Sequence, residues 1–348
     1  MARLITHGWE SGYLYEQGAI LNVQPQLVSG PALISSNARS GNYAASFQVN
    51  VYGNSNIGNG QWIVLGVAGN PSEVYLRIAA RVSLSNGYGK YLIQFRDGAT
   101  IQVSLDVLAS GQLQARCGAT VLGTAGGIGT AWTCIEMRVK IDPSAGVVQV
   151  WQDGKSIISF TGNTRSSSVS QITALLCGWM NTVSCNDATV VVIDDIALND
   201  TTGPVNNGRI GQGGIYPLFP IADTVDKDFS RSSGADNYSL VNSIMADDDV
   251  TYVQDGVVGD RDLYKITSFG AGGQIDVVTV LAKMRSVNGS GAKAGLTILS
   301  SNGISVGSQY QFGNAYTYAA QAWELDPGCN SVWVASAINS LLIGVTVQ

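Results

Sequence analysis

Apolar and polar residues alternate with a period of two along much of this chain, most clearly in Thr133–Ile141. Ile135, Met137, Val139 and Ile141 fall on one face of an extended strand. The opposite face carries Cys134, Glu136, Arg138 and Lys140. A strand with one apolar and one polar face belongs to an antiparallel sheet that covers a core on one side. The sequence therefore predicts that the four apolar side chains are buried.

Turn dipeptides separate the alternating runs. Asp153-Gly154 lies between Val147–Trp151 and Ser156–Phe160, and an Asp-Gly pair favours a type I′ hairpin turn because both central residues need positive φ. Asp97-Gly98 and Asn302-Gly303 repeat the arrangement. Roughly a dozen such strands, spaced by about 8–12 residues up to about residue 198, predict a β-sandwich or jelly roll.

A shift in composition marks a domain boundary. The polar tract Asn199–Gly214 carries five glycines and a proline, and it follows the apolar strand Thr189–Leu198. The sequence predicts a jelly-roll domain in residues 1–200, a linker in residues 201–214 and a smaller β-domain in residues 215–348.

The second half is also predicted to be built of strands. The unit is expected to start at Ile215–Ile221. Its expected strands are Leu263–Ser268, Ile275–Met284, Ala294–Ser300, Val332–Ala335 and Leu341–Val347. Two short helices are expected at Asp236–Met245 and at Ser336–Leu342, where a serine suits the N-cap. Neither is long enough to organise a domain, so the fold class is all-β.

Composition moves the expectation away from an enzyme. The chain has one histidine, His7, among 348 residues, and charged residues make up 13% of it against roughly 25% in an ordinary domain. The net charge is −6 with no basic block, which excludes a nucleic-acid partner. No apolar run approaches a membrane span or a secretory signal, so folding in a cytoplasm is expected. The five scattered cysteines, expected to be buried and reduced, are Cys117, Cys134, Cys177, Cys185 and Cys329.

Three motifs carry a family resemblance. They are Ile34–Phe47 (ISSNARSGNYAASF), Ala131–Gly154 (AWTCIEMRVKIDPSAGVVQVWQDG) and Val192–Asp200 (VIDDIALND). In this order they resemble the concanavalin A-like, laminin-G-type jelly rolls of tailed-bacteriophage virion proteins. The second half resembles the β-domain appended to those proteins through Tyr216–Pro220, Ala222-Asp223, Gly234–Tyr238, Asp247–Tyr252 and Trp333–Gly344. The resemblance implies a jelly-roll domain in a virion protein.

The usual catalytic constellations are missing from the sequence. Retaining glycosidases of this fold place paired glutamates on one strand face, whereas Glu136 has only Cys134 and Arg138 as same-face neighbours and is interpreted as a solvated charge. His7 is interpreted as a structural side chain, because the chain has no G-x-S-x-G turn and no clustered zinc ligands.

Calcium and aromatic sites remain as alternatives. Asp194-Asp195 and Asp247–Asp249 carry carboxylates of the kind that bind calcium, but adjacent strand residues point to opposite faces, and solvated turns are favoured. Aromatic residues suit either the core or an exposed sugar-stacking or subunit contact. The candidates are Trp62, Trp132, Trp151, Trp179, Trp323, Trp333, Tyr310, Tyr316 and Tyr318.

Together these features predict a non-catalytic structural protein of a phage virion, acting as a capsid decoration or as a neck or tail component. Other virion proteins and further copies of the chain are the expected partners. The alternative is a tail adhesin that binds a host-surface glycan, and a glycan hydrolase is a third, less favoured class. No catalytic, cofactor-binding or metal-ligating residue is assigned, and no cofactor is expected.

Overall fold

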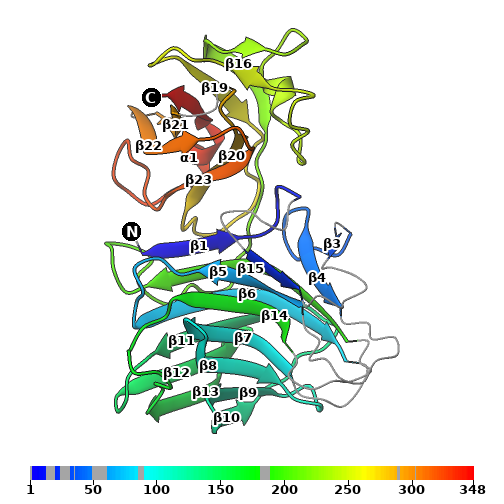
Figure 1. Ribbon diagram of the computed structural model, residues 1–348, viewed down its shortest axis with the longest axis vertical. Coiled ribbons are helices and arrows are strands. Elements are labelled where there is room, and N and C mark those ends of the chain that lie inside the picture. Colours follow the sequence, from blue (N-terminus) through cyan, green and yellow to red (C-terminus); the bar gives the residue numbers. More distant parts are fainter. Residues whose placement is uncertain are drawn as a thin grey trace. The chain divides into compact units, whose positions relative to one another are not determined.

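The computed structural model describes residues 2–12, 20–23, 32–34, 36–48, 61–84, 90–180, 189–287, 291–301 and 303–348. The chain divides into two units, which meet in sequence between Tyr216 and Pro217. Each unit is built from antiparallel strands, coloured from blue to green in the first and from yellow-green to red in the second (Figure 1). The predicted fold class, a jelly-roll sandwich followed by a smaller sandwich-like β-unit, is confirmed.

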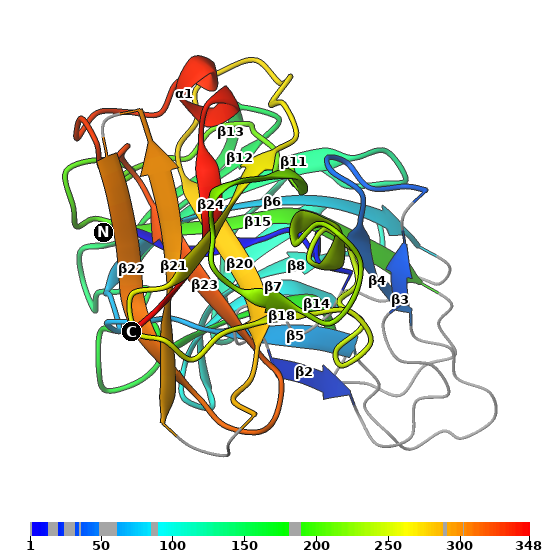
Figure 2. The ribbon, with the colours of Figure 1, turned by 90° about the horizontal axis from the view of Figure 1, so that it is seen from above.

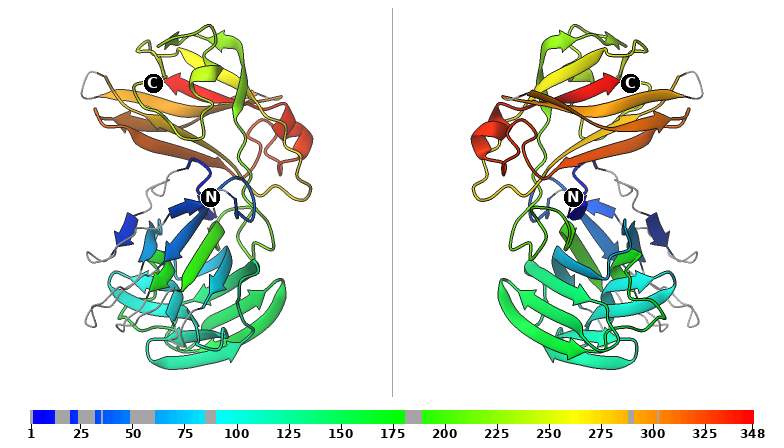
Figure 3. Two further views of the ribbon diagram at one scale, coloured as in Figure 1. Left: turned by 90° about the vertical axis from the view of Figure 1, so that its right-hand side faces the viewer. Right: turned by 90° about the vertical axis from the view of Figure 1, so that its left-hand side faces the viewer.

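The first unit stacks two sheets (Figure 3). Sheet A contains β1 (Arg3–His7), β3 (Ala32–Ile34), β4 (Ala44–Gln48), β6 (Glu73–Ser83), β11 (Thr133–Lys140), β12 (Gly146–Gln152), β13 (Lys155–Gly162) and β15 (Val190–Asp200). Its strand order is β13-β12-β11-β6-β15-β4-β3, and β1 also pairs with β15.

Sheet B contains β2 (Ile20–Val23), β5 (Gln61–Gly66), β7 (Lys90–Asp97), β8 (Thr100–Val107), β9 (Leu113–Cys117), β10 (Thr120–Ala125) and β14 (Ala174–Met180). Its strand order is β10-β9-β8-β7-β14-β5-β2. Alternate residues of each strand therefore face either sheet A or the outside of the sandwich.

The core of the first unit lies between the two sheets. Ile135, Met137, Val139 and Ile141 each expose 1% of their surface or less, which confirms their predicted burial. Strand β11 pairs in unbroken register with both neighbours, so Met137 lies opposite Leu76 and Val150. Sheet B contributes large side chains to the same core, among them Phe95, Leu105 and Trp179.

The predicted turn between β12 and β13 is present. Asp153 has φ 48° and Gly154 has φ 82°, so both central residues take the positive φ that a type I′ turn needs. Gly98, with φ 56°, lies in the turn between β7 and β8. The third predicted turn includes Asn302, which lies outside the described residues.

The second unit is a smaller sandwich, seen in Figure 2 with its longest strands side by side. Sheet C has the order β16 (Pro220–Lys227), β19 (Arg261–Ile266), β24 (Leu342–Val347), β21 (Ala292–Ser300) and β22 (Gly303–Phe312). Strand β20 (Val278–Met284) pairs with β23 (Thr317–Trp323), and β17 (Ser230–Arg231) pairs with β18 (Val253–Gln254). Leu296, Ile298, Trp323 and Trp333 are among the residues of its core.

Three local predictions in the second unit are wrong. Val332–Ala335 is not a strand, because Trp333 makes a single bridge to Ile275 and helix α1 (Ala335–Asn339) follows at once. The predicted N-cap Ser336 lies inside α1, and Asp236–Met245 holds only the short 3₁₀ helix η2 (Tyr238–Leu240).

Candidate functional site

Segment 208–215, most of which belongs to the predicted linker, lies over part of the outer face of sheet A. Arg209 donates to both carboxyl oxygens of Glu136, at 3.0 and 2.6 Å, and its guanidinium lies 4.7 Å from the ring centre of Trp151. The backbone N–H of Gly211 donates to the same carboxyl at 2.7 Å. Glu136 is 1% exposed, so its interpretation as a solvated charge is wrong. A partly exposed arginine and a backbone N–H of the covering segment therefore hold this buried carboxylate.

The Asp194-Asp195 pair lies under the same covering segment. Asp195 has φ 56°, and at this point β15 changes partner from β4 to β1, so simple alternation is broken. The backbone N–H of Arg39 donates to Asp194 at 2.8 Å. Asp195 accepts from the Arg39 guanidinium and from the backbone N–H of Ile215, both at 2.7 Å. Burial, together with the charge of Asp195, raises the pKa of Asp194 to about 7. Both carboxyls serve to join segments of the unit.

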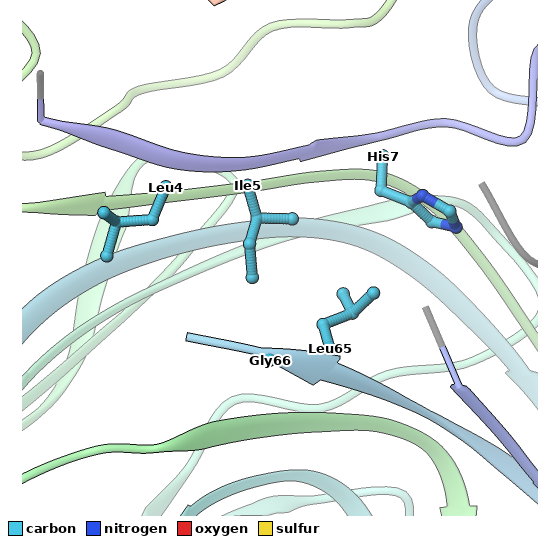
Figure 4. A pocket seen from close by; sticks show the side chains of 5 residues that line it. All are labelled: Leu4, Ile5, His7, Leu65 and Gly66. Atoms are coloured by element: carbon cyan, nitrogen blue, oxygen red, sulfur yellow. The ribbon is translucent and has the colours of Figure 1, made fainter. Parts of the chain in front are cut away.

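His7 is a core residue. It is 1% exposed, its ring contacts Trp9 edge to face at 4.6 Å, and burial lowers its pKa to about 3. It lines a cavity of about 50 Å³ with Leu4, Ile5 and Leu65 (Figure 4). This volume holds a water molecule or two and no substrate. The structure therefore places His7 where catalysis on a glycan has no room.

The carboxylates of Asp247–Asp249 are held by partners within the second unit. Asp247 accepts from Thr251, Asp248 pairs with Lys283, and Asp249 pairs with Arg285 and accepts from Tyr316 at 3.0 Å. Among the described residues, no group of three or more His, Cys, Asp and Glu side chains is arranged to hold a metal ion.

The cysteines and tryptophans fall into buried and partly exposed sets. Cys117, Cys134 and Cys177 are buried, whereas Cys329 is exposed, contrary to prediction, and Cys185 lies outside the described residues. Trp179, Trp323 and Trp333 are buried. Trp132 and Trp151 are half-buried. The ring of Trp132 lies against the guanidinium of Arg81 on β6, and the ring of Trp151 lies against that of Arg209 in the covering segment. Trp62 is half-buried on the outer face of sheet B.

That outer face of sheet B is polar across several strands. The outward positions of three neighbouring strands are Gln94 and Arg96 on β7, Ser104 and Asp106 on β8, and Gln114 and Arg116 on β9. Gln94 pairs with Ser104 and Ser104 pairs with Arg116, so these residues form rows across the sheet. The alternation that buries Phe95, Val103 and Leu105 projects this second set of side chains away from the core.

Trp62 lies near one end of this face, and the residue opposite it, Gly178, has no side chain. Gly178 on β14 pairs with Trp62 on β5. A Cβ at Gly178 would lie 2.6 Å from the Cα of Trp62 and 2.4 Å from the carbonyl oxygen of Gln61. Gly178 also has φ 147°, a conformation that L-residues rarely adopt. The glycine therefore permits the close approach that positions the indole.

Asp106 is the distinctive group of this face. It is 8% exposed, lies opposite Tyr91 on β7, and its Oδ2 is 4.0 Å from Nε of Arg116. Its Oδ1 has no hydrogen-bond partner among the described residues. Burial raises the pKa of this carboxyl to about 6, although a hydrogen bond from Ser104 and the charge of Arg116 act in the opposite direction. Near neutral pH the carboxyl therefore exists in both protonation states.

Further hydrogen-bond donors lie along the same face. Arg96 donates from Nε to Oε1 of Gln94 at 2.8 Å, and Arg116 donates from Nη1 to Oε1 of Gln114 at 3.1 Å. Gln114 in turn donates to Thr124 at 2.9 Å. The glutamine oxygens hold the two guanidinium groups in place on the sheet. Both arginines are half-exposed, so their remaining N–H groups are open to a ligand from solvent.

Comparisons with known proteins found solved structures that are similar to part of this chain. No family model matches the chain, and no curated protein matches it. A solved endo-β-1,4-glucuronan lyase from the fungus Trichoderma reesei is similar over 60% of this chain and 100% of its own, with 14% identity and a TM-score of 0.46. A sialidase matches 57% of this chain and 18% of its own, at 12% identity and a TM-score of 0.40. An alginate lyase of polysaccharide lyase family 7 matches 51% of this chain and 87% of its own, at 10% identity and a TM-score of 0.36.

These neighbours contradict the prediction of a non-catalytic virion protein, and with it the prediction that the chain is not an enzyme. The structures named are lyases and a sialidase, and none of them is a virion protein. A scarcity of histidine does not by itself exclude an enzyme, because Asp, Tyr and Arg side chains also supply acid–base and charge-stabilising groups. Among the described residues, no helix is long and apolar enough to cross a membrane.

Proposed function

We propose that the first unit binds an acidic polysaccharide along the outer face of sheet B and exchanges a proton with it at the Asp106 carboxyl. The observation that carries the proposal is this carboxyl, nearly buried, with an unpartnered oxygen and a pKa raised to about 6. An acid or base is most effective when its pKa lies near the working pH.

The extent of the face supports a polymeric ligand. Trp62, Gly178, Tyr91, Asp106 and Gln114 lie on five successive strands, from β5 through β14, β7 and β8 to β9. Four interstrand spacings of about 4.8 Å make this row about 19 Å long. Several linked sugar rings fit such a length, with Trp62 offering an aromatic surface at one end.

The charge on the face supports an acidic sugar. Arg96 and Arg116 are half-exposed on the same side of the sheet as Asp106. A guanidinium binds a carboxylate through two parallel hydrogen bonds. A uronic-acid unit placed beside Asp106 would have its carboxylate neutralised by Arg116, and Tyr91 lies across from Asp106 as a second group able to carry a proton.

A panel of soluble polymers tests the proposal. Alginate, polyglucuronate and polygalacturonate are compared with neutral dextran, binding by affinity electrophoresis and cleavage by newly formed reducing ends and unsaturated uronyl products. Asp106→Asn is expected to lower the cleavage rate by about 100-fold or more while binding is retained. Arg116→Ala is expected to weaken binding. Arg138→Ala, an arginine on the outer face of sheet A, is the matched control and is expected to change neither.

Two results would overturn the proposal. Binding of neutral and acidic polymers with equal strength would exclude recognition by the arginines. An undiminished cleavage rate in Asp106→Asn would exclude the proton transfer.

The location of the protein in a virion, in several copies and beside other virion proteins, stays a prediction supported by the sequence resemblance.

A further inference from the structure

A second cavity lies in the second unit, far along the chain from Asp106. Its volume is about 360 Å³, and its lining comes from the end of β21, the turn 326–331 and helix α1. Cavities that bind small molecules begin at about 300 Å³. This cavity therefore has room for a small ligand, in contrast to the one beside His7.

A buried carboxyl lines this cavity. Asp326 is 3% exposed, and its Oδ1 accepts the backbone N–H of Gly328 at 2.9 Å. The carbonyl of Asp326 accepts from Asn330 at 2.7 Å, and its N–H donates to the carbonyl of Ser331 at 2.9 Å. These bonds fix the residue at both main-chain groups and at one carboxyl oxygen. Its Oδ2 makes no hydrogen bond within the described part of the chain, which leaves one acceptor for a ligand.

Hydroxyls and apolar surface complete the lining. Ser301 and Ser336 both border the cavity, and their hydroxyls make no hydrogen bond to any described residue. Val332 and Val334 border it too, and each is 53% exposed. No Lys, Arg or His is present among the described residues of the lining. Acceptors and hydroxyls beside apolar surface suit a neutral ligand that carries hydroxyls and C–H faces.

We propose that this cavity binds a neutral sugar unit, which would donate a hydroxyl to Oδ2 of Asp326 and pack its C–H face on Val332 and Val334. The site is separate from the outer face of sheet B, since all of its lining belongs to the second unit. Its failure would therefore leave the proposed function untouched.

Cys329 provides a reporter for binding. It lines the cavity and is exposed, whereas Cys117, Cys134 and Cys177 are buried. Cys185 lies outside the described residues, so the full chain with Cys185→Ser is the starting protein. The measurement is the rate at which a disulfide reagent modifies the remaining reactive thiol, with increasing glucose, galactose, mannose or their methyl glycosides. At least one of these sugars is expected to slow the reaction threefold or more, with saturation, and glucose 6-phosphate is expected to protect less.

Two variants of α1 separate binding from indirect effects. Ser336→Phe fills the cavity and is expected to abolish protection by sugar. Ala335→Phe adds the same ring at the neighbouring exposed position outside the lining, and protection is expected to persist. The inference is overturned if no neutral sugar protects the starting protein, or if Ser336→Phe is protected equally well. Protection by glucosamine alone would also overturn it, because the carboxyl would then bind a cation.

Discussion

The two outer faces of the jelly-roll unit use similar side chains in opposite ways. On sheet A, Glu136 and Asp195 are buried against cations and backbone N–H groups that the chain itself supplies. On sheet B, Asp106 is nearly as buried but keeps one carboxyl oxygen without a partner among the described residues. The carboxyls on sheet A are paired by a second segment of the chain, whereas Oδ1 of Asp106 is buried without a partner among the described residues. Burial alone does not distinguish the two cases.

Arg209→Ala tests the structural face and carries the largest expected effect. It leaves the buried Glu136 with the N–H of Gly211 but without a cation. Because the Arg209 side chain is itself 38% exposed, the expected cost is about 3 kcal/mol, at the low end of the range for breaking a buried ion pair. The free energy of unfolding from urea titration measures the loss, and limited proteolysis is expected to cut within residues 201–214. A change below about 1 kcal/mol would show that the covering segment contributes little to sheet A.

The pH dependence of stability tests the second face. The folded-state pKa of Asp106, about 6, lies above the ordinary 3.8, so the folded state favours the protonated carboxyl. Its stabilising contribution is full below about pH 4 and is lost as pH rises through about 6. Asp106→Asn removes this loss. Between pH 4 and pH 7, the free energy of unfolding of the variant is therefore expected to rise relative to that of the wild type by up to about 3 kcal/mol.

Urea unfolding of both proteins at several pH values provides that measurement. The raised pKa of Asp194 is present in both proteins, so its effect cancels in the difference. A difference that stays constant across this range would mean that Asp106 titrates normally, which would remove the main support for proton transfer.

Gly178→Ala tests the position of Trp62. The added methyl group meets the backbone of Gln61 and Trp62, and overpacking of this kind costs about 1–3 kcal/mol. Polymer binding is expected to weaken as well, since the indole has to move. Gly66→Ala is the matched control on β5, because nothing lies within 4 Å of the added Cβ. Equal binding by both variants would remove Trp62 from the proposed binding face.

Arg138→Ala carries the smallest expected effect. Arg138 donates to Glu73 at 2.7 Å and lies 5.8 Å from the ring centre of Tyr75. Its partner carboxylate is 16% exposed, whereas Glu136, the partner of Arg209, is 2% exposed. Pairs this open to solvent are worth about 1 kcal/mol or less. Thermal or urea unfolding checks the value, and a loss as large as that of Arg209→Ala would contradict the distinction between covered and open pairs on sheet A.

The period-two pattern of the sequence predicted most of the architecture. Period-two alternation placed Met137 and its companions in the core correctly, because side chains on a strand alternate between faces whatever the strand pairs with. The positive φ values of Asp153 and Gly154 also follow from local sequence preference. The same alternation was present in β7, β8 and β9, where Gln94, Ser104 and Gln114 mark a polar outer face that the sequence analysis did not single out.

The functional assignments depended on contacts between distant segments, and those did not follow from local pattern. Glu136 looked solvated because its partner Arg209 lies 73 residues away in sequence. Asp195 does not follow simple alternation, because the pairing partner of β15 changes from β4 to β1 at that point. The carboxyls of Asp194 and Asp195 therefore both accept hydrogen bonds from Arg39. The sequence around Asp106 did not indicate a buried carboxyl, because its burial and its raised pKa arise only when β7, β8 and β9 assemble.

By itself, the sequence determined the all-β class, the faces of its clearest strands and the turns that join them, because backbone preference and hydrophobic period act over a few residues. Only the tertiary structure decided which acidic groups the chain neutralises and which keep an oxygen without a partner among the described residues. Electrostatic environment depends on distance in space and on exclusion of water, and segments remote in sequence set both.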